Sequence, residues 1–269
     1  MEKKNIFSFR MSDGNVVQME AYDTLPSTAA LAKEYAEAGY PDRYVVFADR
    51  QTTTPITGTK LKEGASERGV FLSCILRPSL FASQAGFFGP MAAVALTSAL
   101  EEHSNSRFGI GWVSDVYCNG LRIGGAMLEG KLDRFSAFEY LIVTFAIRLD
   151  DDNFPPRLTD IIRKVFESEN ASLPMIIGRT VLTRFFALYP SAKTPKKFMD
   201  AYSQKFLLRG RKIKRRLDDG KFERVKVLGI DNKSGALMVA AGNGEVLHIT
   251  ARGNVILPKK IRIRNKDKS

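Results

Sequence analysis

The arrangement of apolar residues changes near residue 207, and this change constrains the fold more than any single motif. After Gly210 the chain consists of short apolar segments separated by Gly and Asp, a pattern typical of strands joined by tight turns. Five such strands within about 50 residues predict a small β-barrel. The expected strands cover residues 212–217, 222–230, 236–240, 246–250 and 254–257.

Residues 1–206 combine helix and strand patterns without an internal repeat. Ser27 can cap a helix in which Leu31, Tyr35 and Ala36 share one face, and Asn119-Gly120 is a strong hairpin signal. Residues 51–68 lack an apolar period and predict a long, mobile loop. We expect strands over residues 5–10, 15–19, 44–48, 70–76, 108–112, 116–119, 122–129 and 138–149, and helices from Ser27 and over residues 84–102, 157–168, 174–189 and 194–208.

These patterns predict an α+β fold, in which a mixed or antiparallel sheet is packed by helices and followed by the small barrel. The expected domain boundaries are residues 1–206 for the larger domain and residues 207–258 for the barrel. Residues 259–269, which include six Lys or Arg, would form a basic tail.

The net charge of +12 comes entirely from the C-terminal part. Residues 1–204 hold 23 basic and 23 acidic side chains, whereas residues 205–269 hold 18 basic and 6 acidic ones. An anionic partner is therefore expected to meet the C-terminal part. Three kinds of partner remain open, namely an acidic protein domain, nucleic acid or a phosphate-bearing ligand, and a merely solvated basic surface is the alternative.

Composition excludes several classes of protein. Two cysteines and two histidines are too few for a disulfide framework, a four-cysteine zinc site or a multi-histidine metal centre, so no metal site is expected. No apolar run approaches the roughly 18–20 residues of a membrane helix. The first residues lack the apolar segment of a secretory signal, so we expect a cytoplasmic protein without membrane contact.

Several short motifs occur in the order in which the biotin protein ligases carry them. Ser27-Thr28 stands where that family has Ser-Thr-Asn, and Gln51-Thr52 stands where it has Gln-Thr-Ala-Gly-Arg-Gly-Arg. Trp112 and Asp115-Val116 correspond to Lys-Trp-Pro-Asn-Asp-Val. Three longer segments also resemble the family's motifs: residues 69–78 (GVFLSCILRP), residues 122–129 (RIGGAMLE) and residues 228–237 in the barrel.

The chain therefore resembles the biotin protein ligase family over residues 25–257. The resemblance implies a class II biotin/lipoate ligase-like fold and an ATP-dependent reaction that forms biotinyl-AMP. Biotin would then pass to a lysine on the carrier domain of a carboxylase. It also implies biotin and ATP with Mg²⁺ as ligands and a possible homodimer. Only a short segment precedes Ser27, so we expect no N-terminal DNA-binding domain of the kind some family members carry.

The resemblance also assigns roles to individual residues. Arg122 stands at the position of the family's catalytic lysine. The biotin-binding residues would be Ser27, Thr28, Gln51, Arg122 and Gly125, and the nucleotide- or phosphate-binding residues would be Lys60, Lys62, Trp112, Asp115 and Arg148.

The departures from the family pattern are concentrated in the phosphate-binding half. The loop of residues 54–60 reads Thr-Pro-Ile-Thr-Gly-Thr-Lys, in which Pro55 has no N–H to donate to a phosphate. Arg122 replaces the lysine, and Arg148 replaces an asparagine. The pattern predicts that biotin recognition is retained while adenylation is weak or lost.

Other interpretations remain open at this stage. Lys60, Lys62, Arg68, Arg122 and Arg148 could together form a relocated phosphate site, and Asp115 could hold Mg²⁺ through water. Ser27-Thr28 could serve only as a helix cap. The protein could be a non-catalytic biotin- or carrier-binding relative, a lipoate ligase-like protein or a nucleic-acid-binding module.

Overall fold

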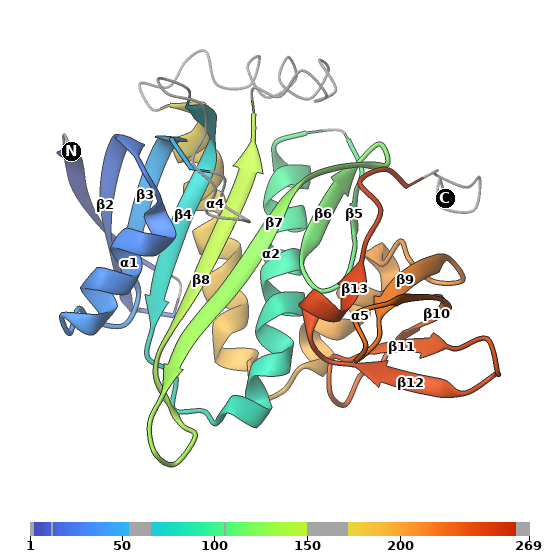
Figure 1. Cartoon of the computed structure of the whole chain (residues 1–269). Coiled ribbons are helices and arrows are strands. Elements are labelled where there is room, and N and C mark those ends of the chain that lie inside the picture. The colour runs from blue at the N-terminus through green and yellow to red at the C-terminus, as the bar shows by residue number, and fades with distance from the viewer. Residues whose placement is uncertain (1–2, 12, 54–65, 105, 150–171, 262–269) are drawn as a thin grey trace.

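The computed structural model describes residues 3–11, 13–53, 66–104, 106–149 and 172–261, which Figure 1 draws in colour. The predicted helix over residues 157–168 and most of the predicted loop at 51–68, including Lys60 and Lys62, lie outside the described residues. Within the described part of the chain, no helix is long and apolar enough to cross a membrane.

A mixed sheet of eight strands forms the larger part of the molecule, as the sequence predicts. Its order is β1-β2-β3-β4-β8-β7-β6-β5, with β2 and β3 parallel and every other neighbouring pair antiparallel. The strands are β1 Lys3–Arg10, β2 Val16–Leu25, β3 Tyr44–Gln51, β4 Glu67–Leu76, β5 Phe108–Ile110, β6 Asp115–Cys118, β7 Leu121–Leu132 and β8 Phe138–Arg148.

Strand β2 runs six residues beyond its predicted end, through a buried carboxylate. Glu20 is 4% exposed and accepts hydrogen bonds from the hydroxyls of Tyr22, Tyr35 and Tyr44 at 2.7, 2.9 and 2.7 Å. Because a buried charged group must be hydrogen-bonded, these three hydroxyls allow the strand to continue into the core.

Helices cover both faces of this sheet (Figure 1). Helix α1 (Thr28–Glu37) packs on Val46 and Ile75, whereas the alternate residues Val45 and Cys74 belong to the core on the other side. Successive side chains of a strand point to opposite faces, so α1 covers one face and the remaining helices cover the other. Those helices are α2 (Phe88–Glu102), α4 (Leu173–Leu188) and α5 (Lys196–Lys205).

The long helix predicted from residue 84 begins only at Phe88. Residues Ala82–Phe87 form a 3-10 helix instead. In an α-helix, the ring of Pro90 would collide with the carbonyl four residues earlier, at Gly86. Proline is tolerated only in the first turn, which fixes the start of α2. The last helix is likewise shorter than residues 194–208, because Phe206 leaves it to form a bridge with Ile110.

All five predicted C-terminal strands are present. They form an antiparallel sheet in the order β12-β11-β10-β9-β13. Among the described residues the edge strands β12 and β13 do not pair with each other, so hydrogen bonds do not close the sheet into the predicted barrel. The strands are β9 Lys212–Arg216, β10 Phe222–Ile230, β11 Leu237–Ala240, β12 Val246–Ile249 and β13 Val255–Ile256.

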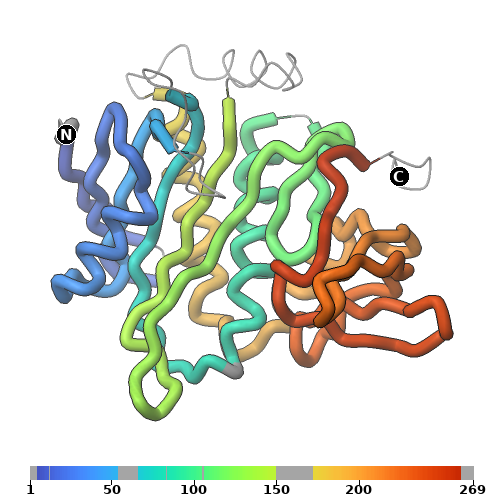
Figure 2. Tube along the Cα trace, viewed as in Figure 1, coloured from blue at the N-terminus to red at the C-terminus, as the bar shows by residue number. Residues whose placement is uncertain are grey.

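The C-terminal sheet and the larger sheet share one hydrophobic core. Val225, Val227 and Leu237 are buried in the same cluster as Ile110 and Trp112. In Figure 2 the orange and red C-terminal part lies against the end of the molecule that carries β5 and β6. The two expected domains are therefore packed as one body.

The chain returns to the larger sheet after β13. The amide of Arg122 donates to the carbonyl of Lys259 at 3.0 Å, and the amide of Ile261 donates to the carbonyl of Gly120 at 2.6 Å. Ile261 is buried at 3% exposure. The segment 259–261, which the sequence assigns to the basic tail, thus lies against the β6–β7 hairpin.

The packing between the two parts predicts different costs for two glycine substitutions. Gly235 and Gly220 both have positive φ, +74° and +81°, but a Cβ at Gly235 would lie 2.7 Å from the carbonyl oxygen of Gly86, whereas a Cβ at Gly220 would meet nothing within 4 Å. Gly220→Ala should cost about 1–2 kcal/mol from backbone strain alone. Gly235→Ala should cost at least about 1 kcal/mol more in urea unfolding. Equal costs would show that the close contact with Gly86 is not rigid.

Burial predicts that both thiols are unreactive in the folded protein. Cys74 and Cys118 are free and fully buried, and burial raises the pKa of Cys118 to about 11 and that of Cys74 further still. Because the thiolate is the reactive form, a raised pKa suppresses reaction at pH 8. A thiol reagent such as Ellman's should label neither cysteine in the native state and both in denaturant. Rapid labelling of Cys118 in the native state would contradict its packing in the hairpin.

Candidate functional site

Four buried polar side chains form a connected row beneath the N-terminus of α1. Thr28, Gln51, Ser73 and Thr144 are between 0 and 4% exposed. The Ser73 hydroxyl donates to Thr28 Oγ1 at 3.0 Å and lies 2.8 Å from Thr144 Oγ1. Gln51 Oε1 accepts the backbone N–H of Thr28 at 2.6 Å. We call these four residues the polar row.

The start of α1 positions the polar row. Ser27 is the N-cap, and its hydroxyl accepts the N–H of Ala30 at 3.2 Å. The first N–H groups of a helix have no partner within the helix, and Gln51 satisfies the one at Thr28. Ser27 and Gln51 therefore have structural roles in the free protein, and both stand at the predicted biotin-binding positions beside Thr28.

Ser73 and Thr144 are functional candidates that the sequence analysis missed. Each interrupts a buried apolar run, residues 70–76 of β4 or residues 141–147 of β8, and the two are directly paired in the sheet register. A lone hydroxyl residue in such a strand is a weak signal, and only the register shows that the two hydroxyls meet.

Gly125 lies on the same face of the sheet as the polar row, but at some distance from Gln51. Gly125 on β7 pairs with Ala146 on β8, Ala146 pairs with Phe71 on β4, and Phe71 pairs with Ala48 on β3, the strand that ends at Gln51. Three inter-strand steps separate Gly125 from Ala48 by about 14 Å, and Gln51 lies three residues further along β3, so Gln51 and Gly125 are about 17 Å apart. A ligand that touches both Gln51 and Gly125 must therefore extend across β4 and β8.

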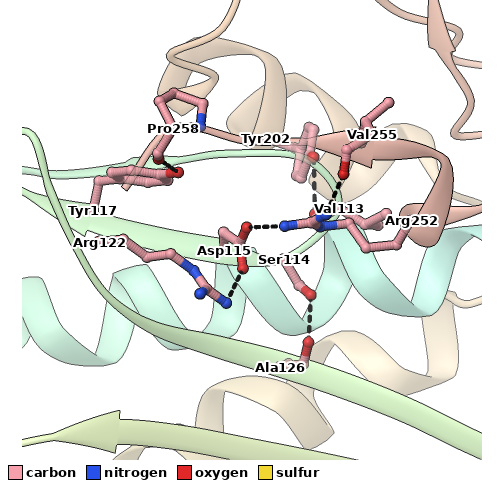
Figure 3. A network of polar contacts seen from close by, with 10 residues as sticks. All are labelled: Val113, Ser114, Asp115, Tyr117, Arg122, Ala126, Tyr202, Arg252, Val255 and Pro258. Atoms are coloured by element: carbon pink, nitrogen blue, oxygen red, sulfur yellow. Dashed lines mark hydrogen bonds and ion pairs between the residues drawn. The ribbon is translucent and has the colours of Figure 1, made fainter. Parts of the chain in front are cut away.

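Asp115 is held between two arginines from the two parts of the chain (Figure 3). Its Oδ1 lies 2.6 Å from Arg122 Nη2 on β7, and its Oδ2 lies 2.9 Å from Arg252 Nη2 after β12. Arg252 also donates to the carbonyl of Val255 at 3.0 Å. The side chain of Asp115 is only 9% exposed, so both of its oxygens are taken up within the protein. We call these three residues the Asp115 clamp.

The predicted nucleotide-binding residues that the structure describes are also engaged. Trp112 is 1% exposed, and its indole N–H donates to the carbonyl of Gly235 at 3.2 Å. Arg148 Nε lies 3.0 Å from Glu67 Oε2. Across the described residues no three His, Cys, Asp or Glu side chains gather as metal ligands, and the Asp115 clamp leaves no carboxylate oxygen free to bind Mg²⁺.

The described arrangement thus divides the predicted site into two halves. One half is a neutral, buried set of hydroxyl and amide groups. The other half is a set of ion pairs, in which Arg122 and Arg252 share Asp115 and Arg148 is bound to Glu67. Chemically, the first half can donate and accept hydrogen bonds to a polar ring, whereas in the second half ion pairs already occupy part of the guanidinium donors of Arg122 and Arg148.

Sequence comparison finds two relatives among characterised proteins. The protein named bifunctional ligase/repressor BirA of Bacillus subtilis is 28% identical over 141 residues, which is 52% of this chain and 43% of that protein. The protein of the same name from Bacillus spizizenii is 25% identical over 152 residues, 56% of this chain and 47% of that protein. The match therefore spans less than half the length of each relative. No protein-family model matches the chain.

Solved structures share the fold over almost the whole chain. A mutant of the Aquifex aeolicus biotin protein ligase, in complex with biotin, has a TM-score of 0.65 at 21% identity, covering 89% of this chain and 97% of that one. A biotin protein ligase-like protein of unknown function from Silicibacter has a TM-score of 0.63 at 14% identity, covering 87% and 94%.

The Asp115 clamp predicts a large effect of removing a single carboxylate. Asp115→Ala would leave Arg122 and Arg252 close together without a counter-charge, and we expect a loss of about 1.5–3 kcal/mol in the free energy of unfolding. Asp219→Ala is the control, because Asp219 pairs with Lys221 on the surface and such pairs contribute less than about 1 kcal/mol. Urea unfolding measures both values. Equal, small losses would show that the clamp does not join the two parts.

Proposed function

We propose that this member of the biotin protein ligase family binds biotin, or a close analogue with a ureido ring, on the α1 face of its sheet and forms biotinyl-AMP weakly or not at all. The observation that carries the proposal is the polar row, a buried and connected set of hydroxyl and amide groups, in which Thr28 and Gln51 stand at predicted biotin-binding positions. Its neutral chemistry suits a neutral, polar ring.

A ureido ring offers one carbonyl acceptor and two N–H donors. The hydroxyls of Thr28, Ser73 and Thr144 can each donate and accept, and the amide of Gln51 offers both kinds of group. Because these side chains are buried and hold one another in place, they would bind a ring without first having to be ordered. A charged ligand group would find no counter-charge within the polar row.

The adenylation step needs positive charge beside two anions, the carboxylate of biotin and the α-phosphate of ATP. Bound ATP with Mg²⁺ would supply the adenylyl group. In this chain Arg122 and Arg148 stand at the corresponding positions, but both are in ion pairs, and Trp112 is buried against the C-terminal sheet. Loss of one charge-stabilising donor typically costs about 10²–10³ in rate, which supports weak or absent turnover.

A second candidate function follows from the same two halves. A chain that binds biotin without activating it could still bind a biotin carrier domain that already carries biotin. The intact polar row, and the ion pairs in which Arg122 and Arg148 are already engaged, favour this non-catalytic role over a lipoate ligase-like one. The carrier domain of a carboxylase is then the proposed partner in both cases.

Calorimetry of biotin binding tests the first part of the proposal. We expect biotin to bind the free chain, and Thr144→Val, which removes one hydroxyl at constant shape, to weaken binding about tenfold. Thr97→Val is the matched control, because Thr97 is also fully buried but its hydroxyl donates to carbonyls of Ala93 and Val94 within α2. Biotin binding that is absent, or equally weakened in both variants, would overturn the proposed pocket.

ATP–pyrophosphate exchange in the presence of biotin tests the second part. We expect exchange far below the turnover of ordinary enzymes, which begins at about 1 s⁻¹. Addition of ATP with Mg²⁺ should also leave the biotin affinity nearly unchanged, because Arg122 remains bound to Asp115. Exchange near 1 s⁻¹ would show that the cations have been repositioned and that the protein is an active ligase.

A further inference from the structure

The outer face of the C-terminal sheet carries a regular array of positive charge. On β9, Lys212, Lys214 and Arg216 are exposed, and on β10, Arg224 and Lys226 are exposed. The alternate residues of both strands point inward, where Ile213, Val225 and Val227 are buried in the core. We call the five exposed cations the basic face.

The sheet register places the five cations in two adjacent rows. Lys212 pairs with Lys226, Lys214 pairs with Arg224, and Arg216 pairs with Phe222. Like charges directly opposite each other on neighbouring strands destabilise a sheet. Folding alone would therefore favour acidic partners at these positions, so the basic face lowers stability in the absence of a bound anion.

No carboxylate in the described part of the chain forms an ion pair with any of the five cations. The neighbouring carboxylate, Glu223, is bound to Arg215 Nε at 2.6 Å. Among the described residues, the positive charge of the basic face therefore has no paired carboxylate, and its five side chains are exposed. Polyanions are the ligands that such a surface attracts.

The geometry suits an extended phosphate backbone. Alternate residues of a strand lie about 6.8 Å apart, and neighbouring strands lie about 4.8 Å apart, so the two rows form a narrow, periodic track. Phosphates repeat along an extended single strand of nucleic acid in a comparably regular way. Each row can contact successive phosphates without any change in the backbone of the protein.

Two observations favour nucleic acid over an acidic protein. Three of the five cations are lysines, which are depleted from protein–protein interfaces but are common in phosphate contacts. Phe222 is 51% exposed beside Arg216 at the end of the track. An exposed aromatic ring beside a basic track is the arrangement on which unpaired bases stack.

We propose that the basic face binds the phosphate backbone of single-stranded nucleic acid, with one base stacked on Phe222. The proposal does not depend on biotin binding, because the basic face shares no residue with the polar row or the Asp115 clamp. It also does not involve the residues after 261, which lie outside the described chain.

Fluorescence anisotropy of the full chain with a labelled, mixed-sequence 20-nucleotide single strand tests the proposal. We expect binding tighter than about 10 µM at 50 mM salt, falling steeply as salt rises. The triple variant Lys212→Glu, Lys214→Glu, Lys226→Glu should lose more than tenfold in affinity. Its slope of log K against log salt should fall by about 2, since each phosphate contact on a single strand contributes about 0.7.

A second triple variant shows whether a loss of affinity comes from the basic face itself or only from the change in net charge. Lys193, Lys196 and Lys197 are exposed lysines at the start of α5, and changing all three to Glu alters the net charge by the same amount. We expect this control to change affinity less than threefold. All variants should remain folded under the assay conditions, because the substituted side chains are exposed, and thermal unfolding checks this.

The stacking of a base on Phe222 can be tested separately. Phe222→Ala should weaken binding of the single strand about fivefold or more and leave binding of a 20-base-pair duplex unchanged. Phe135→Ala, at an exposed phenylalanine in the β7–β8 turn, should change neither affinity. The proposal is overturned if the single strand does not bind, if the control triple loses as much affinity, or if polyglutamate or anionic lipid vesicles bind the basic face at least as tightly.

Discussion

The contact between Asp115 and the two arginines that flank it determines how the rest of the structure is joined. Asp115 opens β6, Arg122 lies on the adjacent strand β7, and Arg252 comes from the C-terminal part, 137 residues further along the chain. One nearly buried carboxylate thus binds a guanidinium from each side. The same junction holds the indole of Trp112 and the returning segment at residue 259, so the β6–β7 hairpin is fixed from several directions.

The junction at Asp115 explains why the neutral polar row and the exposed positive charge lie in different parts of the molecule. Two arginines near the proposed ligand site already form ion pairs within the protein, Arg122 with Asp115 and Arg148 with Glu67. The polar row nearby is neutral. Uncompensated positive charge is found instead on the outer surface of the C-terminal sheet, where β9 and β10 alternate exposed cations with buried aliphatic residues. The proposed small-molecule site and the proposed polyanion-binding surface are therefore built on different sheets.

Much of the fold could be predicted because its signals are local. Alternating exposed and buried residues identify β9 and β10, and Asn119-Gly120 forms a turn in which both residues have positive φ, 49° and 81°. Ser27 caps α1 as expected. The helix predicted from residue 84 is α-helical only from Phe88, because the ring of Pro90 excludes an earlier α-helical turn. The family resemblance predicted the kind of sheet and its packing by helices, but the order of the strands is known only from the structure.

The site was less accessible from sequence, because its decisive contacts join residues far apart in the chain. Ser73 meets Thr144 through strand register, 71 residues away, and Asp115 meets Arg252 only after the C-terminal sheet has packed. The predicted residues Thr28 and Gln51 do meet, but through a hydrogen bond from the backbone N–H of Thr28 at the start of the helix. A sequence motif does not reveal such a backbone contact. Motifs locate side chains that face a site, but not which of them already have partners.

The ion pairs that Asp115 forms with Arg122 and Arg252 affect how tightly Arg122 can bind an anion. A phosphate that takes the Nη2 donor of Arg122 would replace Asp115, whose Oδ1 lies 2.6 Å away, and the displaced carboxylate oxygen would lose a charge-assisted hydrogen bond. Asp115 would keep Arg252 as its counter-charge, so the exchange does not leave a buried charge unpaired. Phosphate affinity at this donor of Arg122 is thus the difference between two ion pairs rather than the strength of one. Arg252 reduces that difference by keeping the released carboxylate neutralised, and in this way the C-terminal part influences chemistry on the larger sheet without contacting the ligand.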